Sequence, residues 1–462
     1  MRVIQAVGRG LLATLKVLQL ALPKVGVGWM FALLTIDFNR IAIFELGIAA
    51  ILVTTMLGMN HLFSPFQVFF GRIADQNPIF GFRRTPYLII SGIVSSLIFI
   101  SLPTVVHAMA DGFVLAFIGG YALLILFGVS SAATGDSHNA LIVEATTPKT
   151  RGMVVSVVQI ITILSTIIAA VVMNIVRPEY SPEAMQRLYN LTPFVVLGAM
   201  ALGLIRMEKR LKGEELRASV AKARAAVPEG NPFGVAFGVL RTNRQARGFF
   251  FFISLSIFSI FLQDNILEVF GAEVFGLSVA ETTKFQPTWG GGVLVGMLVM
   301  GALSVFLPIT KKRIAQIGCY GTAVGMSILA FAALTHTEEL VHPALLFMGV
   351  FTGFFNVGAL AMMMEMTIEG AVGMYMGLWG VAQALGTFTA STTSGALHTS
   401  LIGSGFLEPG VAYMGIFALE AVGMLTTAYI LAHLSTQRFR EVHESRLTRR
   451  DLEQALEAGA LA

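Results

Sequence analysis

The sequence predicts an all-α membrane protein with twelve transmembrane helices, arranged as two pseudo-symmetric bundles of six. Of its 462 residues, 55% are hydrophobic and only 13% are charged, whereas soluble proteins carry about 25% charged residues. The apolar runs extend toward the ~20 residues that a helix needs to cross a bilayer. The longest hydrophilic interruption, from Arg206 to Arg247, lies at the middle of the chain. A soluble fold is therefore excluded, and the interruption divides the chain into six spans and six.

The individual spans follow from apolar runs that end at charged or Pro/Gly-rich breaks. Twelve such runs can be separated along the chain. They cover residues 23–42, 47–70, 86–106, 113–136, 152–176, 190–207, 248–267, 284–308, 314–335, 342–364, 373–398 and 410–433.

The segments between and outside the bundles complete the predicted organisation. Residues 1–22 alternate basic and apolar side chains and have no small-residue cleavage site, which indicates an amphipathic cytoplasmic segment. The two bundles are predicted at 23–207 and 248–433, joined by a cytoplasmic linker at 208–247 with a basic surface helix. Residues 434–462 are predicted to form a cytoplasmic tail. The single cysteine, Cys319, excludes an intramolecular disulfide and fits a small buried side chain.

The distribution of basic residues predicts the orientation. We place both termini, the central linker and the loops that follow the second, fourth, eighth and tenth spans on one side. That side then holds all but four of the 31 Lys and Arg residues. The four exceptions are Arg40, Arg177, Arg187 and Lys284. Because cytoplasmic loops carry the excess of positive charge, both termini are predicted to be cytoplasmic, in the inner membrane of a bacterium.

Two weak internal matches support a six-plus-six repeat. "EATTPKTRGM" from Glu144 resembles "EMTIEGAVGM" from Glu365, and both follow the fourth span of their half. "FELGIAAILVTT" from Phe44 is similar to "EVFGLSVAETT" from Glu273 at nearly the same offset. Such repeats are typical of transporter folds.

The charged stretch "GRIADQNPIFGFRR" after the second span is the most informative loop. It lacks the Lys–Ser/Thr pair of a phosphate-binding P-loop. It resembles the signature of the major facilitator superfamily, with an insertion of about three residues before the second glycine. The matching residues include Gly71, Asp75, Gly81, Arg83 and Arg84. Arg151 after the fourth span resembles the second part of that charge relay. The resemblance implies a cytoplasmic latch between the two halves, whose contacts form in one conformation and break in another.

Few polar residues lie inside the predicted spans, and those that do are informative because their burial in lipid is costly. One group (Asp37, Asn39, Arg40 and Glu45) closes the first span, and another (Asp264, Glu268 and Glu273) is predicted at the outer end of the seventh. Mutually paired interfacial charges are as good an interpretation of these groups as a functional site. The Phe- and Met-rich interior is more typical of packing than of a ligand site, although it would suit a large planar lipophilic ligand.

Three longer segments resemble a narrower group, the PucC/LhaA family of bacteriochlorophyll delivery proteins. They are "DFNRIAIFELGIAAILV" from Asp37, "SPFQVFFGRIAD" from Ser64 and "LQDNILEVFGAEVFGLSVAETT" from Leu262. The chain departs from the family pattern at Ala49, Gln67 and Val269. The polar residues that carry this resemblance are Asn39, Arg40, Glu45, Gln263, Asp264 and Glu268.

The resemblance implies a non-catalytic assembly factor of the photosynthetic membrane. Its expected cargo is bacteriochlorophyll or chlorophyll held transiently, with carotenoid or lipid as further candidates. Its expected partners are antenna polypeptides, the reaction-centre complex, pigment-synthesis enzymes and membrane lipids, but no nucleic acid. The magnesium of a chlorin accepts one axial ligand, commonly imidazole, so His61 and His138, with the neighbouring Asn60, are the candidate pigment ligands. A hydrogen bond to an adjacent helix is the plainer role for either histidine.

The sequence also permits one alternative function. The same scaffold serves secondary transporters, so proton-coupled or facilitated transport of another lipophilic solute would also explain the sequence. No Ser/His/Asp, metal-cluster or nucleotide-binding motif lies at a plausible site for catalysis.

Overall fold

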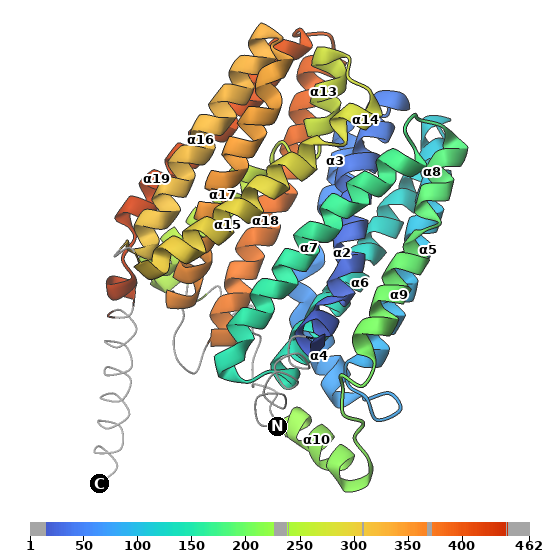
Figure 1. The fold of residues 1–462 in the computed structure, drawn as a ribbon, viewed down its shortest axis with the longest axis vertical. Coiled ribbons are helices and arrows are strands. Elements are labelled where there is room, and N and C mark those ends of the chain that lie inside the picture. Colours follow the sequence, from blue (N-terminus) through green and yellow to red (C-terminus); the bar gives the residue numbers. More distant parts are fainter. Residues whose placement is uncertain are drawn as a thin grey trace, which may run out of the picture.

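The computed structural model describes residues 15–225, 238, 240–306, 309–366, 372–439 and 441. Over these residues the chain is helical and contains no strand beyond an isolated bridge between Ile79 and Phe82. Figure 1 shows the helices side by side, with α4 and α10 at one end and α8, α13 and α14 at the other. We call the end with α4 and α10 the basic end, and the other the opposite end.

The first half contains six passages between these ends. A continuous helical segment, Leu15–Glu45, makes the first passage; it includes α2 (Pro23–Ala32) and two π-helical segments, η1 (Leu33–Phe38) and η2 (Ile41–Glu45). The second passage is broken into three elements. The remaining elements of this half are α3 (Ala50–Met59), η3 (Asn60–Phe66), α4 (Gln67–Gln76), α5 (Thr85–Ala110), α6 (Val114–Ala145), α7 (Pro148–Val176), α8 (Pro182–Tyr189) and α9 (Thr192–Leu204).

The second half repeats the pattern after the linker helix α10 (Gly213–Ala225). Its first passage is broken by a turn at residues 262–266. Its elements are α12 (Arg244–Phe261), α13 (Leu267–Phe275), α14 (Val279–Thr282), α15 (Phe285–Phe306), α16 (Lys311–Thr335), η4 (Glu338–Leu340), α17 (Val341–Glu365), α18 (Val372–His398), η5 (Thr399–Gly403) and α19 (Pro409–His433).

Local sequence explains where several helices begin. Pro stands in the first turn of α5, α7, α8, α9 and α19, where its missing N–H costs nothing. The side chains of Ser181, Asn243 and Thr310 accept hydrogen bonds from the first free backbone N–H groups of α8, α12 and α16.

Nine helical segments in the described part of the chain are long and apolar enough to cross a membrane. The other three predicted spans are the second, the seventh and the eleventh. The second is broken at η3, and the seventh is broken at residues 262–266. The eleventh, α18, is one helix, but its residues 387–394 are rich in Ser and Thr, which lowers its apolarity.

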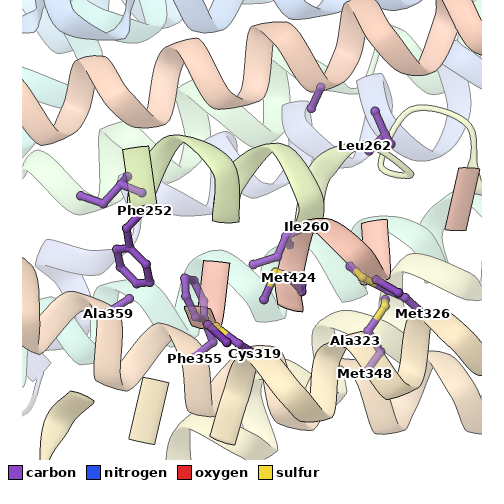
Figure 2. Close-up of a cluster of buried hydrophobic side chains, with 14 of the residues drawn as sticks. Phe252, Ile260, Leu262, Cys319, Ala323, Met326, Met348, Phe355, Ala359 and Met424 are labelled. Atoms are coloured by element: carbon purple, nitrogen blue, oxygen red, sulfur yellow. The ribbon is translucent and has the colours of Figure 1, made fainter. Parts of the chain in front are cut away.

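Two clusters of buried apolar side chains hold the molecule together, one in each half, and the cluster of the first half also includes Val269 of α13. Figure 2 shows part of the second, in which Phe252, Cys319, Met326, Met348 and Met424 interlock. Cys319 is buried and free, as predicted. The methionines drawn there are completely buried or nearly so, and they fill the core rather than line a cavity.

Three helical or packed segments extend beyond their predicted boundaries. Residues 15–22, expected on the membrane surface, belong to the first spanning helix, and Leu20 and Ala21 are buried. The predicted tail begins too early, because Phe439 is buried with its ring 5.4 Å from that of Tyr375. The seventh passage continues through α13 to Phe275. In each case tertiary packing covers residues that local sequence presents as surface.

The two halves meet where α3 and η3 pack against α18, and where α7 passes α15. Gly58 and Gly395 permit the first contact, because a Cβ on Gly58 would lie 2.9 Å from the Cβ of Ser391 and a Cβ on Gly395 would overlap the hydroxyl of Thr54. Small residues allow helix backbones in membranes to approach closely.

Candidate functional site

Charged residues of α4, of the loop after it and of α6 form a compact group at the basic end, which we call the arginine cluster. It consists of Asp75, Arg83, Arg84, Asp136 and Glu144. Arg84 donates to Asp75 at 2.6 Å and to Glu144 at 3.3 Å, and its guanidinium lies 4.0 Å from Asp136. Arg83 lies 3.2 Å from Glu144 and 3.7 Å from Asp75. The side chain of Arg84 is only 6% exposed, so a single buried cation faces three carboxylates.

The linker closes over this cluster. The carboxylate of Glu208 accepts hydrogen bonds from the backbone N–H groups of Arg83, Arg84 and Thr85, at 2.6, 3.0 and 2.7 Å. These are the free N–H groups at the start of α5, where the helix dipole also favours a negative charge. Glu208 therefore caps a helix that is distant in sequence.

Gly81 makes the contact with the linker possible. Its φ is +84°, a conformation that favours glycine, and a Cβ would collide with the carbonyl oxygen of Leu211. The Leu211 N–H donates to the Gly81 carbonyl at 2.8 Å, and the Arg210 guanidinium donates to the Phe80 carbonyl at 2.9 Å. Glu208 could not be recognised from the sequence, because a linker carboxylate does not reveal which helix it will reach.

The arginine cluster differs in one respect from the predicted latch. Its described partners come from the first half and the linker, rather than from the second half. The surroundings of Gly71 and the side chain of Arg151, two further residues of the predicted latch, lie outside the described residues.

The second half has a simpler counterpart of this cluster. Lys311, at the start of α16, donates to Glu365, at the end of α17, at 2.5 Å. Glu365 is the residue that matches Glu144 in the internal repeat. The two glutamates occupy equivalent positions, each at the end of its helix and each paired with a basic residue at or just before the start of the preceding helix.

A second polar group lies at the opposite end, where the halves meet. We call it the junction cluster; it consists of Asn39, Arg40, Glu45, Gln263, Asp264 and Glu268. Arg40 donates to Glu45 at 2.5 Å and to the Leu277 carbonyl of the other half at 3.2 Å. Asn39 donates to Glu268, also across the halves, at 3.4 Å. The segments that begin at Asp37 and Leu262, far apart in sequence, are thus brought together.

Other members of the junction cluster are bound within the second half. Asp264 accepts from Gln286 at 3.0 Å, and Gln263 donates to the sulfur of Met348 at 3.5 Å. Asp264 lies in the turn between α12 and α13, and Glu268 lies in the first turn of α13. Both therefore mark a break in the seventh passage, close to the opposite end.

Two further groups of paired polar side chains lie near the opposite end. Arg177 bonds to Asp37, and both side chains are almost completely buried. Glu273 accepts from His398 at 3.0 Å and from the Tyr413 hydroxyl at 2.8 Å. Arg177 already stood out as an exception to the charge rule. Its pairing explains why an unusual cation is tolerated there, since a buried charge needs a partner.

The two candidate pigment ligands have different environments. His138 is completely buried, and its Nε2 is 2.8 Å from the Leu20 carbonyl. His61 lies in η3, is half-buried, and makes no hydrogen bond within the described part of the chain. Asn60 is turned back onto its own helix, donating to the Leu57 carbonyl at 2.6 Å. Of the three residues, only His61 combines accessibility with an uncommitted imidazole.

A family profile described as "PUCC protein" matches residues 37–439. The chain belongs to the PUCC protein family. This confirms the resemblance carried by the three sequence segments. Over 430 residues the chain is 30% identical to the "Bacteriochlorophyll synthase 44.5 kDa chain" of Rhodobacter capsulatus, covering 90% of this chain and 94% of the relative. Over 445 residues it is 26% identical to "Protein PucC" of Cereibacter sphaeroides, covering 91% and 92%.

Solved structures identify the fold of this PUCC family member. The chain resembles the nucleoside transporter NupG with a TM-score of 0.68 at 13% identity, covering 90% of this chain and 99% of the transporter. The predicted major facilitator architecture is confirmed. At this identity the likeness establishes the fold alone. The chain is a multi-pass membrane protein whose relatives occur in photosynthetic bacteria.

Proposed function

We propose that this protein is an assembly factor that delivers or inserts (bacterio)chlorophyll into light-harvesting complexes and contacts nascent antenna subunits. The observation that carries the proposal is the family match over residues 37–439, together with a relative at 30% identity whose name refers to bacteriochlorophyll. The proposal assigns the chain no catalytic step. It places the basic end in the cytoplasm and the protein in the bacterial inner membrane, because most Lys and Arg residues lie at that end.

The proposed cargo is a magnesium chlorin, and His61 is the proposed axial ligand. A ligating imidazole needs a free nitrogen lone pair and an accessible ring. His61 is partly exposed and makes no hydrogen bond with a described residue, in a 3₁₀ segment that packs between α6 and α18. His61 lies beside the contact between the halves. A change in the packing of the halves would therefore change how easily a pigment reaches His61. Carotenoid or lipid is a further candidate cargo.

The proposed partners are antenna polypeptides and the reaction-centre complex, with pigment-synthesis enzymes as transient suppliers. The test is made in a pigment-synthesising bacterium. We expect the affinity-purified full-length protein to carry a chlorin absorption band, and a deletion strain to assemble less antenna complex. A protein that never co-purifies with chlorin, in a bacterium whose deletion strain assembles normal antenna, would contradict the proposal.

The role of His61 is tested with a matched histidine. We expect His61→Leu to reduce the pigment-to-protein ratio severalfold while leaving the unfolding temperature close to that of the parent, since no hydrogen bond is lost. His138→Leu should instead lower stability by about 1–2 kcal/mol, because the buried Leu20 carbonyl loses its partner. Equal pigment stoichiometry in His61→Leu and the parent would remove His61 from the site.

The fold favours one alternative, secondary transport of another lipophilic solute. Under this alternative Asp136, in α6 beside Arg84, is the group expected to couple transport to protons. Proton-dependent solute uptake into proteoliposomes that is abolished by Asp136→Asn would favour the transporter. Uptake that is absent in the parent would favour the assembly factor.

A further inference from the structure

A hollow of about 640 Å³ lies at the basic end, where the start of α12 meets the end of α19. Three arginines line it: Arg244 and Arg247 from the first turns of α12, and Arg438 after α19. Its volume lies in the range of small-ligand sites. Among the described residues that line it, none is acidic.

The three arginines differ from the paired cations of this end. Arg83, Arg84, Lys209 and Lys311 all pair with carboxylates. Arg244, Arg247 and Arg438 make no ion pair in the part of the chain that the structure describes. The general excess of Lys and Arg at this end explains why the three arginines are present. It does not explain why three unpaired guanidinium groups surround one hollow.

The wall of the hollow is apolar and aromatic. Phe251 lies about one helical turn after Arg247 in α12, and Tyr429 lies about one turn before His433 in α19. The two side chains are 58% and 66% exposed. The Tyr429 ring lies 4.5 Å from that of His433. The arginines match the phosphate of a phospholipid, and the exposed aromatic side chains match its apolar part. Aromatic rings of this kind are enriched at the level of the lipid headgroups.

Packing beneath the hollow fixes its shape. A Cβ on Gly248 would lie 2.8 Å from Leu434, so the two helices approach closely there. Gln245 accepts from the Ser435 N–H at 2.9 Å, and Lys312 donates to the carbonyls of Ala432 and Leu434 at 2.6 and 2.8 Å. The carbonyl groups at the end of α19 are therefore satisfied by side chains, and the three arginines stay free to bind an anion.

We propose that this hollow binds an anionic phospholipid, with its phosphate between Arg244, Arg247 and Arg438 and an acyl chain along Phe251 and Tyr429. Guanidinium groups bind phosphate oxygens through charge-assisted hydrogen bonds, and basic pockets between transmembrane helices hold lipid headgroups. The lipid would join α12 to α19, the first and last passages of the second half. The proposal does not depend on the pigment-delivery role.

The test uses the delipidated full-length protein in detergent, titrated with dioleoyl-phosphatidylglycerol or dioleoyl-phosphatidylcholine and followed by native mass spectrometry. We expect phosphatidylglycerol to bind at least about tenfold more tightly. The triple variant R244Q/R247Q/R438Q should lose this preference. The control variant K212Q/R217Q/R224Q, which removes three exposed charges from the linker and α10, should keep it.

Three results would overturn the proposal. The two lipids could bind equally to the parent, the triple variant could keep the preference, or inorganic phosphate at the same concentration could displace phosphatidylglycerol. The last result would identify a site for free anions. If the triple variant does not elute as a single species, R247Q alone decides the question, with an expected loss of severalfold in affinity.

Discussion

At the scale of single residues, Arg84 is the centre of the charge balance in the first half. It reaches Asp75, Glu144 and Asp136 from a position that is almost completely buried. We expect Arg84→Gln to lower the free energy of unfolding by roughly 2 kcal/mol, because three carboxylates would face one another with one cation fewer. Arg83→Gln, the adjacent and more exposed residue, should cost less than about 1 kcal/mol. Thermal unfolding of the purified variants measures both, and equal losses would contradict the assignment.

Glu208 is the second residue whose effect can be predicted. Glu208→Gln removes the charge that faces the start of α5 and weakens its three hydrogen bonds with backbone N–H groups. We expect a loss of about 1 kcal/mol, the usual value of a helix cap. Glu214→Gln, on the exposed first turn of α10, is the matched control and should be neutral. Hydrogen exchange at the amides of residues 83–85 should also rise in the Glu208 variant alone.

At the scale of elements, the contact between α3 and α18 depends on the absence of side chains at a few positions. Gly395→Ala would place a methyl group onto Thr54 and the backbone of α3. We expect it to lower stability by about 1–3 kcal/mol, the usual cost of overpacking. Gly377→Ala, on the same helix but with open space around it, should be neutral or slightly stabilising. A neutral Gly395→Ala would show that the two helices do not meet as described.

Two of the membrane passages contain irregular helical segments. The first passage contains two π-helical segments next to Asp37, Asn39 and Arg40, and the seventh is interrupted beside Asp264. Irregular backbone inside a membrane protein needs partners for its polar groups. Here the broken segments lie in the junction cluster, whose side chains and backbone carbonyls supply such partners.

At the scale of the whole molecule, three hydrogen bonds between described residues join the halves: Asn39 to Glu268, Arg40 to the Leu277 carbonyl, and the Ile51 N–H to Thr399. All three lie near the opposite end. In a Cys319→Ser background, we therefore expect the pair Ile51→Cys and Thr399→Cys to form a cross-link rapidly with a short bifunctional reagent. The pair Arg83→Cys and Lys311→Cys, in equivalent loops at the basic end, should react more slowly. The reverse order would contradict the described arrangement.

Sequence and structure agree most closely where the signal is local or periodic. Apolar runs of spanning length predicted the helical membrane fold, and the motif around Asp75 predicted a charged group that the structure brings together. The repeat match predicted equivalent positions for Glu144 and Glu365. The division at 23–207 and 248–433 remains a prediction, although each half has its own buried cluster.

The membrane fold and its family were determined by the sequence alone, because a bilayer constrains length and apolarity in every span and the family segments are continuous. Tertiary structure decided which polar groups meet. The approach of Glu208 to α5, the meeting of Asn39 and Glu268, and the different surroundings of His61 and His138 all depend on helix rotation and on the contact between the halves. In "GRIADQNPIFGFRR", the motif identified the charged parts, but only the structure showed that their described partners are the first half and the linker.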